Sequence, residues 1–436
     1  MSLISPARVR GAEPSRAAGP ASSGRLGWLD LLRGIAALTI AIGHYVQNMM
    51  PEAFTRIAAR FDLGSFGVFL FFLVSGYIIP ASLERRGSVR EFWISRFFRI
   101  YPLCAAVVAA GVVVQLLGAY TSLPPIMPFP AHHPAVAALA NLTMLHDFQG
   151  VGGAVFVMWT LSYEMVFYLL VASLFVLGLH RRSAEIAIGF SLVPVVAVSA
   201  FPVLLFSRTL DGTRAVVLGS AVLMLVGLAC MVSGRRALAV VGALVLGGTA
   251  MVLVLTNSRL PGWYSMAVLA TMFAGTAVYR AEQRQIGRAK VVVAAVVVMA
   301  ALLYVGTWHG ESSHTAPTFQ WQWLTAMAAT WGLFAAGMAL RNRRIPRPFT
   351  WLGQISYSVY LVHAVLLCVL LWLVGPAGVA SMSVPAKIGL GVVFCCAVAA
   401  VSHVTFRLVE QPAQRLGRRL SVRLVKPAAG PAAERA

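Results

Sequence analysis

Stretches of about twenty mostly apolar residues recur along the chain, and each is long enough to cross a bilayer as a helix. A barrel strand would be shorter and would alternate in hydrophobicity, so these continuous runs favour helices. We expect about 10–12 spans in an all-α, polytopic transmembrane helix bundle. The candidate spans are residues 26–49, 62–82, 100–118, 155–178, 186–206, 215–232, 237–255, 262–279, 291–307, 320–340, 351–374 and 386–406.

The composition supports a membrane environment. Of the 436 residues, 59% are hydrophobic and 11% are charged, whereas soluble domains are about 45–50% apolar and about 25% charged. A chain of this length cannot enclose such an apolar excess in a water-soluble core, and a bilayer supplies the missing apolar solvent.

The net charge of +21 is distributed as a topology signal. With the N-terminus in the cytoplasm, 28 of the 35 Lys and Arg residues fall on the cytoplasmic side, six fall outside, and Arg33 lies within the first span. This pattern predicts a multi-pass protein of the cell (inner) membrane with both termini in the cytoplasm. No solvated basic face with interleaved aromatic residues is visible, so we expect no nucleic-acid partner.

The sequence predicts three regions along the chain. Residues 1–24 are rich in Ala, Ser, Pro, Gly and Arg and are expected to form a disordered cytoplasmic tail. Residues 25–412 form the membrane domain, and residues 413–436 form a basic cytoplasmic tail. The five cysteines all fall in predicted spans without metal-ligand spacing, so we expect no metal site.

The most informative residues are the ionisable ones inside predicted spans, because each costs about 2.5–3.5 kcal/mol or more at mid-membrane. Arg33 and His44 share the first span, and eleven residues at about 100° each return to nearly the same helix face. This stripe carries a cation near the cytoplasmic end and an imidazole about 16 Å further out. A snorkelling arginine and an interfacial histidine are the structural alternative.

Glu164 lies near mid-membrane with no basic residue close to it on its own helix. Its partner is expected on another helix, among Arg33, His44 and His363, and a purely structural ion pair is the alternative. His363 ends a polar stripe with Ser356 that could instead hold helices together through hydrogen bonds.

Arg96 and Arg99 lie three residues apart where a helix enters the membrane. Two guanidinium groups on one face suit a phosphate-bearing ligand. The alternative is a topology anchor that contacts anionic lipid. The same cytoplasmic stretch also holds Arg85, Arg86 and Arg90.

Together these motifs resemble the acyltransferase-3 family of integral membrane acyltransferases. The matching features, in chain order, are the arginine and histidine of the first span, an aromatic run that ends in Ser-Gly-Tyr, the basic motif, a Trp-Ser-Leu-Ser-x-Glu-x-x-Phe-Tyr motif, a Leu-Gly-x-x-Ser-Tyr-x-x-Tyr-Leu-x-His motif and a terminal Glu-x-Pro. They are carried by Arg33 to His44, Ser75 to Tyr77, Arg96 to Arg99, Trp159 to Tyr168, Leu352 to His363, and Glu410 to Pro412. In the fourth of these features, Thr160 replaces the usual first serine.

The chain departs from the family pattern at two points. Met165 follows Glu164 where many members carry a second acidic residue, so a carboxylate pair is not expected. Some members add an extracytoplasmic SGNH-type domain, and this chain is expected to be a stand-alone acyltransferase.

The resemblance implies transfer of an acyl group, usually acetyl from acetyl-CoA, to a hydroxyl of a glycan such as a cell-surface polysaccharide, a lipid-linked sugar or a secreted small molecule. His44 would be the general base and Glu164 its supporting carboxylate. Arg33, Arg96 and Arg99 would bind the acyl-CoA donor, with no bound cofactor. The resemblance implies supporting roles for Ser75, Trp159, Ser162, Tyr168, Ser356, Tyr357, His363 and Glu410.

Two other classes of protein remain open on the sequence alone. A secondary transporter also has many spans and intramembrane charges, and it would show broken helices in matching halves. A flippase or export component of a polysaccharide system would share the fold, because a fold does not determine a function.

Overall fold

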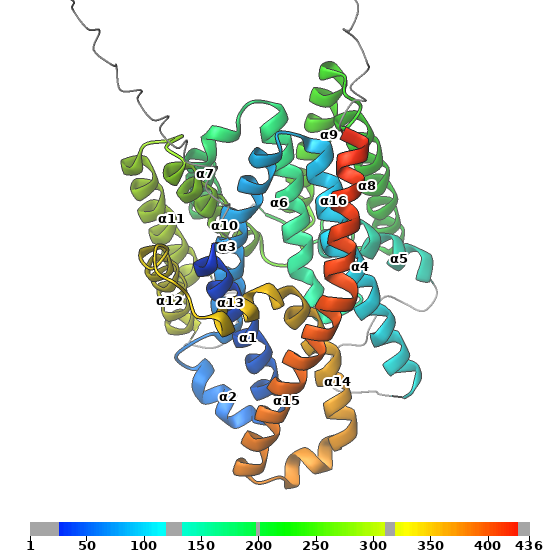
Figure 1. Ribbon diagram of the computed structural model, residues 1–436, viewed down its shortest axis with the longest axis vertical. Helices are drawn as coiled ribbons and strands as arrows, with labels where there is room; N and C mark the ends of the chain where they lie inside the picture. The colour runs from blue at the N-terminus through cyan, green and yellow to red at the C-terminus, as the bar shows by residue number, and fades with distance from the viewer. Residues whose placement is uncertain (1–25, 119–132, 198–200, 310–318, 426–436) are drawn as a thin grey trace, which may run out of the picture.

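The computed structural model describes residues 26–118, 133–197, 201–309 and 319–425, and these form helices with no strand among them (Figure 1). The predicted tail 1–24 lies outside the described residues, as does most of the loop between α4 and α5. The helices are α1 (Gly27–Met49), α2 (Pro51–Ala58), α3 (Leu63–Arg86), α4 (Val89–Leu116), α5 (Pro134–Thr143), α6 (Trp159–Val176), α7 (Ser183–Ala197), α8 (Leu210–Met231), α9 (Arg236–Thr256), α10 (Gly262–Glu282), α11 (Arg288–His309), α12 (Phe319–Ala339), α13 (Arg347–Gln354), α14 (Ser356–Ser381), α15 (Val384–Thr405) and α16 (Gln411–Val425).

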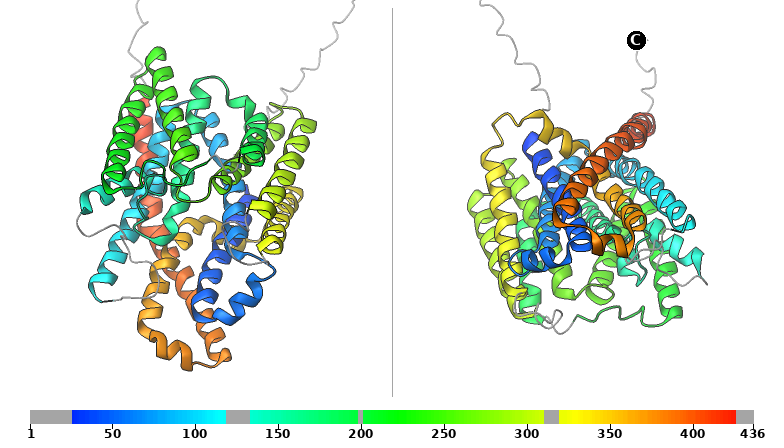
Figure 2. Two further views of the ribbon diagram at one scale, coloured as in Figure 1. Left: turned by 180° about the vertical axis from the view of Figure 1, so that it is seen from behind. Right: turned by 90° about the horizontal axis from the view of Figure 1, so that it is seen from below.

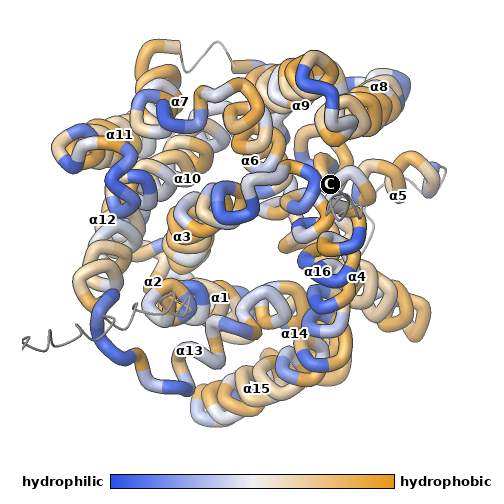
Figure 3. Tube along the Cα trace, turned by 45° about the horizontal axis from the view of Figure 1, so that its top comes forward, coloured by the Kyte–Doolittle hydropathy of each residue, from blue (hydrophilic) through white to orange (hydrophobic). Residues whose placement is uncertain are grey.

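The expected all-α polytopic bundle is confirmed. Within the described ranges, nine helical segments are long and apolar enough to cross a membrane. Helices α7, α10 and α12 occupy the three other predicted ranges. Figure 3 shows hydrophobic residues along the outer helices and hydrophilic stretches at helix ends. Large apolar side chains such as Leu225, Val292 and Leu373 point outward, as expected of surfaces that contact lipid.

Two predicted span boundaries are wrong. The range 186–206 was expected to be one helix, but α7 ends at Ala197 and residues 201–206 are not helical. The backbone N–H of Phe206 instead donates to the Asn257 side chain at 2.8 Å, so the loop after α9 provides the hydrogen bond that a helix would have made. The range 351–374 is interrupted at Ile355, where α13 ends and α14 begins.

The C-terminal residues continue the bundle. A single π-helical turn, Phe406–Glu410, joins α15 to α16 just before Pro412, which has no N–H to donate. The resulting run from Val384 to Leu424 crosses the bundle obliquely (Figures 1 and 2), and α16 packs against α4. Residues 413–425, the first part of the predicted basic tail, are helical, and residues 426–436 lie outside the described part.

The core is organised around the contact between α3 and α10, with α1, α6, α7 and α12 around them. A Cβ at Gly76 would lie 1.9 Å from the carbonyl oxygen of Met272, and a Cβ at Gly275 would lie 2.2 Å from that of Leu73. The two backbones therefore touch directly, which only glycine at these positions allows. The Ser-Gly-Tyr motif thus brings the site-bearing helix α3 against its buried neighbour.

We predict that Gly76→Ala will lower the unfolding temperature of the detergent-solubilised protein by several degrees, because an added methyl group must push two backbones apart. Gly248→Ala on α9 is the control, since a Cβ there has no atom within 4 Å. Equal unfolding temperatures for both variants would contradict direct backbone packing of α3 on α10.

Candidate active site

Helix α1 carries Arg33 and His44 to different parts of the bundle interior. Arg33 is buried, with its guanidinium carbon 5.4 Å from the ring centroid of Phe71 on α3. The His44 ring is half-buried against the edge of Phe156, with ring centroids 5.0 Å apart. Both side chains therefore face protein, which fits the predicted inward-facing stripe on this helix.

His44 pairs with His363 of α14. His44 Nδ1 lies 3.0 Å from His363 Nε2, and the rings stack with centroids 5.3 Å apart and planes at 10°. His363 Nδ1 lies 3.0 Å from the Val359 carbonyl oxygen, which can only accept. Nδ1 of His363 must therefore carry its hydrogen, so its Nε2 accepts the hydrogen of His44 Nδ1. This chain leaves the Nε2 lone pair of neutral His44 free to accept a proton.

The structure does not bring Glu164 into a hydrogen bond with His44. The Tyr168 hydroxyl, one turn further along α6, donates to the Glu164 carboxylate. Glu164 shares the wall of a narrow polar hollow, hereafter the neck, with Arg33, Arg96 and Arg99. Its negative charge therefore faces the three arginines that were expected to bind the donor.

The other walls of the neck come from predicted supporting residues. Ser75 of α3 is buried there, and Tyr357 of α14 donates to the carbonyl oxygen of Ile100 at 2.9 Å. Arg96 is buried, donates to Ser82 Oγ at 2.8 Å, and has its guanidinium carbon 5.5 Å from the ring centroid of Tyr168. The neck is thus a cationic site with one carboxylate, built where α1, α3, α4, α6 and α14 meet.

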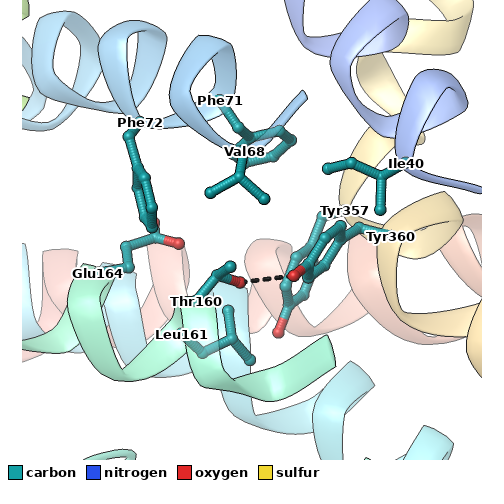
Figure 4. Close-up of a pocket in the computed structure, with 9 residues that line it drawn as sticks. All are labelled: Ile40, Val68, Phe71, Phe72, Thr160, Leu161, Glu164, Tyr357 and Tyr360. Atoms are coloured by element: carbon teal, nitrogen blue, oxygen red, sulfur yellow. Dashed lines mark hydrogen bonds between the residues drawn. The ribbon is translucent and has the colours of Figure 1, made fainter. Parts of the chain in front are cut away.

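An aromatic hollow, hereafter the chamber, is lined by residues of α1, α3, α6 and α14 (Figure 4). The chamber and the neck share Phe71, Glu164 and Tyr357 in their walls. The far wall includes Ile40 and Tyr360, which lie one turn before His44 and His363 on their helices. The chamber therefore extends from the Arg33 region toward the histidine pair.

Tyr360 is fixed in this wall by hydrogen bonds. Its hydroxyl lies 2.7 Å from both Thr160 Oγ1 and the Val157 carbonyl oxygen. Thr160 is the residue that replaces the usual serine of the family motif, and it provides a hydroxyl at this position. The contact joins α14 to the start of α6 across the chamber.

A larger hollow of about 630 Å³, hereafter the mouth, adjoins the neck on its other side. The two share Ile78, Arg96 and Arg99. The mouth is also lined by Arg85 and Arg86 of α3 and by Arg418 of α16. The sequence reasoning did not identify Arg418, although its position in a basic stretch after the Glu-x-Pro motif was a usable signal.

The remaining predicted supporting residues lie outside these three hollows and hold neighbouring segments. Trp159 packs edge-on against Tyr163, with ring centroids 5.8 Å apart. The Ser356 hydroxyl donates to the Gly353 carbonyl oxygen at 2.9 Å, at the break between α13 and α14. Glu410 is buried and accepts hydrogen bonds from Ser358 at 3.1 Å and Gln414 at 3.0 Å, which ties α14 to α16.

Ser162 anchors the loop before α6. Its hydroxyl accepts from the backbone N–H of Asp147 at 3.3 Å. Asp147 lies outside the membrane-spanning segments, and its burial raises the pKa of its carboxyl to about 7. The loop is therefore held by buried polar contacts next to the start of the helix that carries Glu164.

Comparison with known proteins gives a family and two curated relatives. A family model described as an acyltransferase domain matches residues 26–403. The chain is 32% identical over 189 residues to Acyltransferase MdmB of Streptomyces mycarofaciens, covering 41% of this chain and 48% of that protein. It is 28% identical over 163 residues to Nodulation protein 10 of Rhizobium leguminosarum bv. viciae, covering 34% and 44% respectively. The chain thus spans about half the length of the relatives it matches. No solved structure shows significant similarity.

The helix bundle and its interior charged hollows define a multi-pass membrane protein with a site buried among its helices. The family model covers most of the chain, so the chain belongs to the acyltransferase-3 family, as its motifs indicated. Helix α16, with Arg418, lies beyond the matched residues.

We predict that Glu164 is coupled to Arg33 and not to His44. Glu164→Gln and Arg33→Gln should each lower the unfolding temperature by a few degrees, and the double variant should lose less than the sum, because either single change already removes the attraction between the two charges. Glu164→Gln combined with His44→Gln should be additive. Thermal unfolding of the purified protein measures both cycles, and the opposite result would restore Glu164 as the partner of His44.

Proposed function

We propose that this protein transfers an acyl group, in the simplest case acetyl from acetyl-CoA, to a hydroxyl of a sugar-containing or lipid-linked acceptor such as a cell-surface polysaccharide. Family membership supports acyl transfer as the reaction. The observation that carries the proposal is the order of the three hollows: a cationic mouth, a neck with Arg33 and Glu164, and a chamber that extends toward the His44–His363 pair.

The order of the hollows suits a long donor with charged and apolar ends. The arginines of the mouth and neck suit the phosphate groups of CoA. Beyond them the walls of the chamber are mostly aromatic and aliphatic, which suits the uncharged end that carries the thioester. The positive-inside distribution would place the mouth on the cytoplasmic side of the inner membrane, where acyl-CoA is found.

His44 would act as the general base. Its free Nε2 accepts the proton of the acceptor hydroxyl, and the acceptor oxygen attacks the thioester carbonyl carbon. The carbon–sulfur bond then breaks, and the protonated imidazole gives the proton to the departing CoA thiolate. General-base assistance of this kind contributes about 10²–10⁴-fold in rate.

His363 would act as a positioning residue for that base. By accepting from His44 Nδ1–H, it holds the tautomer in which Nε2 is the basic atom. Glu164 would balance the charge of the arginines along the path of the donor, instead of orienting the imidazole.

We predict that His44→Ala will abolish acetyl transfer, because it removes the Nε2 atom that would take the hydroxyl proton, while CoA binding is retained. The measurement is incorporation of labelled acetyl from acetyl-CoA into acceptors in membranes at matched protein level. His403→Ala, at a half-exposed histidine on α15, is the control and should transfer normally.

The same assay tests the proposed positioning role of His363. His363→Ala should reduce transfer by about 10–100-fold without changing CoA affinity, and His363→Gln should recover part of it because its amide oxygen can accept from Nδ1–H. Near-normal transfer by His44→Ala would refute the mechanism. If the unaltered protein transfers no acyl group from any acyl-CoA to an acceptor, the proposed function is wrong. A secondary transporter or a polysaccharide export component would then be the alternatives to test.

A further inference from the structure

The mouth is lined by residues of α3, α4 and α16. A tight turn between α3 and α4 and a glycine in α16 bring these helices together. Gly87 ends α3 with a φ of 64°, and Ser88 caps α4 by accepting from the N–H of Glu91 at 3.3 Å. This tight turn places the arginines at the end of α3 beside those of α4. A Cβ at Gly417 would lie 2.8 Å from Phe98 Cβ, so this glycine lets α16 approach α4 closely and bring Arg418 to the hollow.

The arginines of the mouth lack carboxylate partners. Among the ion pairs of the described residues, none involves Arg85, Arg86 or Arg418. Elsewhere in the bundle, Arg280 pairs with Glu84 and Arg341 pairs with Glu282. Other arginines of the bundle thus have carboxylate partners. The arginines of the mouth instead line one hollow and repel one another, and a bound anion would reduce this repulsion.

Two buried polar groups in the wall of the mouth also have no hydrogen-bond partner. Arg96 is 5% exposed and its Nε makes no hydrogen bond, although its Nη2 donates to Ser82. Ser421 of α16 is 4% exposed and its hydroxyl is likewise unpaired. Buried donors are normally paired, so an unpaired donor in the wall of a hollow is available to a ligand. A topology anchor, which needs only water and lipid around its charges, does not account for them.

We infer that Arg85, Arg86 and Arg418 bind a phosphate monoester, the 3′-phosphate of the acyl-CoA donor. This inference rests on the proposed function and names the group that the mouth recognises. With the thioester in the chamber, the pantetheine arm lies in the neck and the diphosphate lies beside Arg96 and Arg99, which border both hollows. The adenosine 3′-phosphate then remains in the mouth, where a dianion meets forked donors from α3 and α16.

The phosphate of an anionic lipid headgroup shares part of this chemistry, and the experiment separates the two sources. The purified full-length protein is placed in phosphatidylcholine nanodiscs, and its affinities for CoA and for 3′-dephospho-CoA are measured. The test variant is Arg86→Gln with Arg418→Gln. The matched control is Arg90→Gln with Arg419→Gln, which removes the same charge from exposed positions on the same side that do not line the mouth.

The unaltered protein should bind CoA about tenfold or more tightly than 3′-dephospho-CoA, as expected for charge-assisted hydrogen bonds. The test variant should lose that preference and keep its affinity for 3′-dephospho-CoA, while the control variant keeps both. Equal affinity of the unaltered protein for the two ligands, or an undiminished preference in the test variant, would overturn the inference and leave acyl transfer intact.

A second arm uses nanodiscs that contain phosphatidylglycerol. If the unaltered protein retains this lipid through purification, and the test variant loses it with CoA affinity unchanged, the mouth is a lipid site and the inference fails. Failure of the proposed function is distinguishable, because the unaltered protein would then bind neither CoA nor 3′-dephospho-CoA and would transfer no acetyl group.

Discussion

An ionisable side chain within a bilayer must find a partner, and this requirement organises the interior of the protein. Leaving such a group uncompensated costs several kcal/mol, so intramembrane charges face one another or a polar cavity. Here Glu164 faces the arginines of the neck, and His44 faces His363. The neighbouring helices α3 and α10, which pack beside them, touch directly through backbone contacts such as that of Gly76 with Met272.

The partners are divided between two locations along the bundle. Fixed cations and one carboxylate lie in the neck, while the His44–His363 pair lies beyond the chamber. In the proposed mechanism, this division would separate binding of a charged donor from proton transfer at its reactive end. Because α1 carries both Arg33 and His44, one helix would fix the spacing between these two proposed functions.

The sequence predicted most of the helices, because spans are specified by length and hydrophobicity within one segment. It also predicted that Arg33 and His44 share one face of α1, because helix periodicity relates residues on one element. It left the partner of Glu164 open among Arg33, His44 and His363, because spacing along one helix does not show which other helices lie beside it. The family resemblance implied that Glu164 supports His44, whereas Glu164 lines the neck with three arginines and His44 contacts His363. The non-helical 201–206 segment was missed for the same reason: its hydrogen bonds go to Asn257 and Ser258, about fifty residues away. Arg418 was missed because its role depends on how α16 packs against α4.

The central claim is that the donor lies along the path from the mouth to His44. The most direct test is a structure of the protein with a non-hydrolysable acetyl-CoA analogue. The account predicts phosphate density in the mouth and at Arg96 and Arg99, with the acyl carbonyl in the chamber beside His44 Nε2. An analogue bound with its acyl end away from His44, or outside the neck and chamber altogether, would contradict the account.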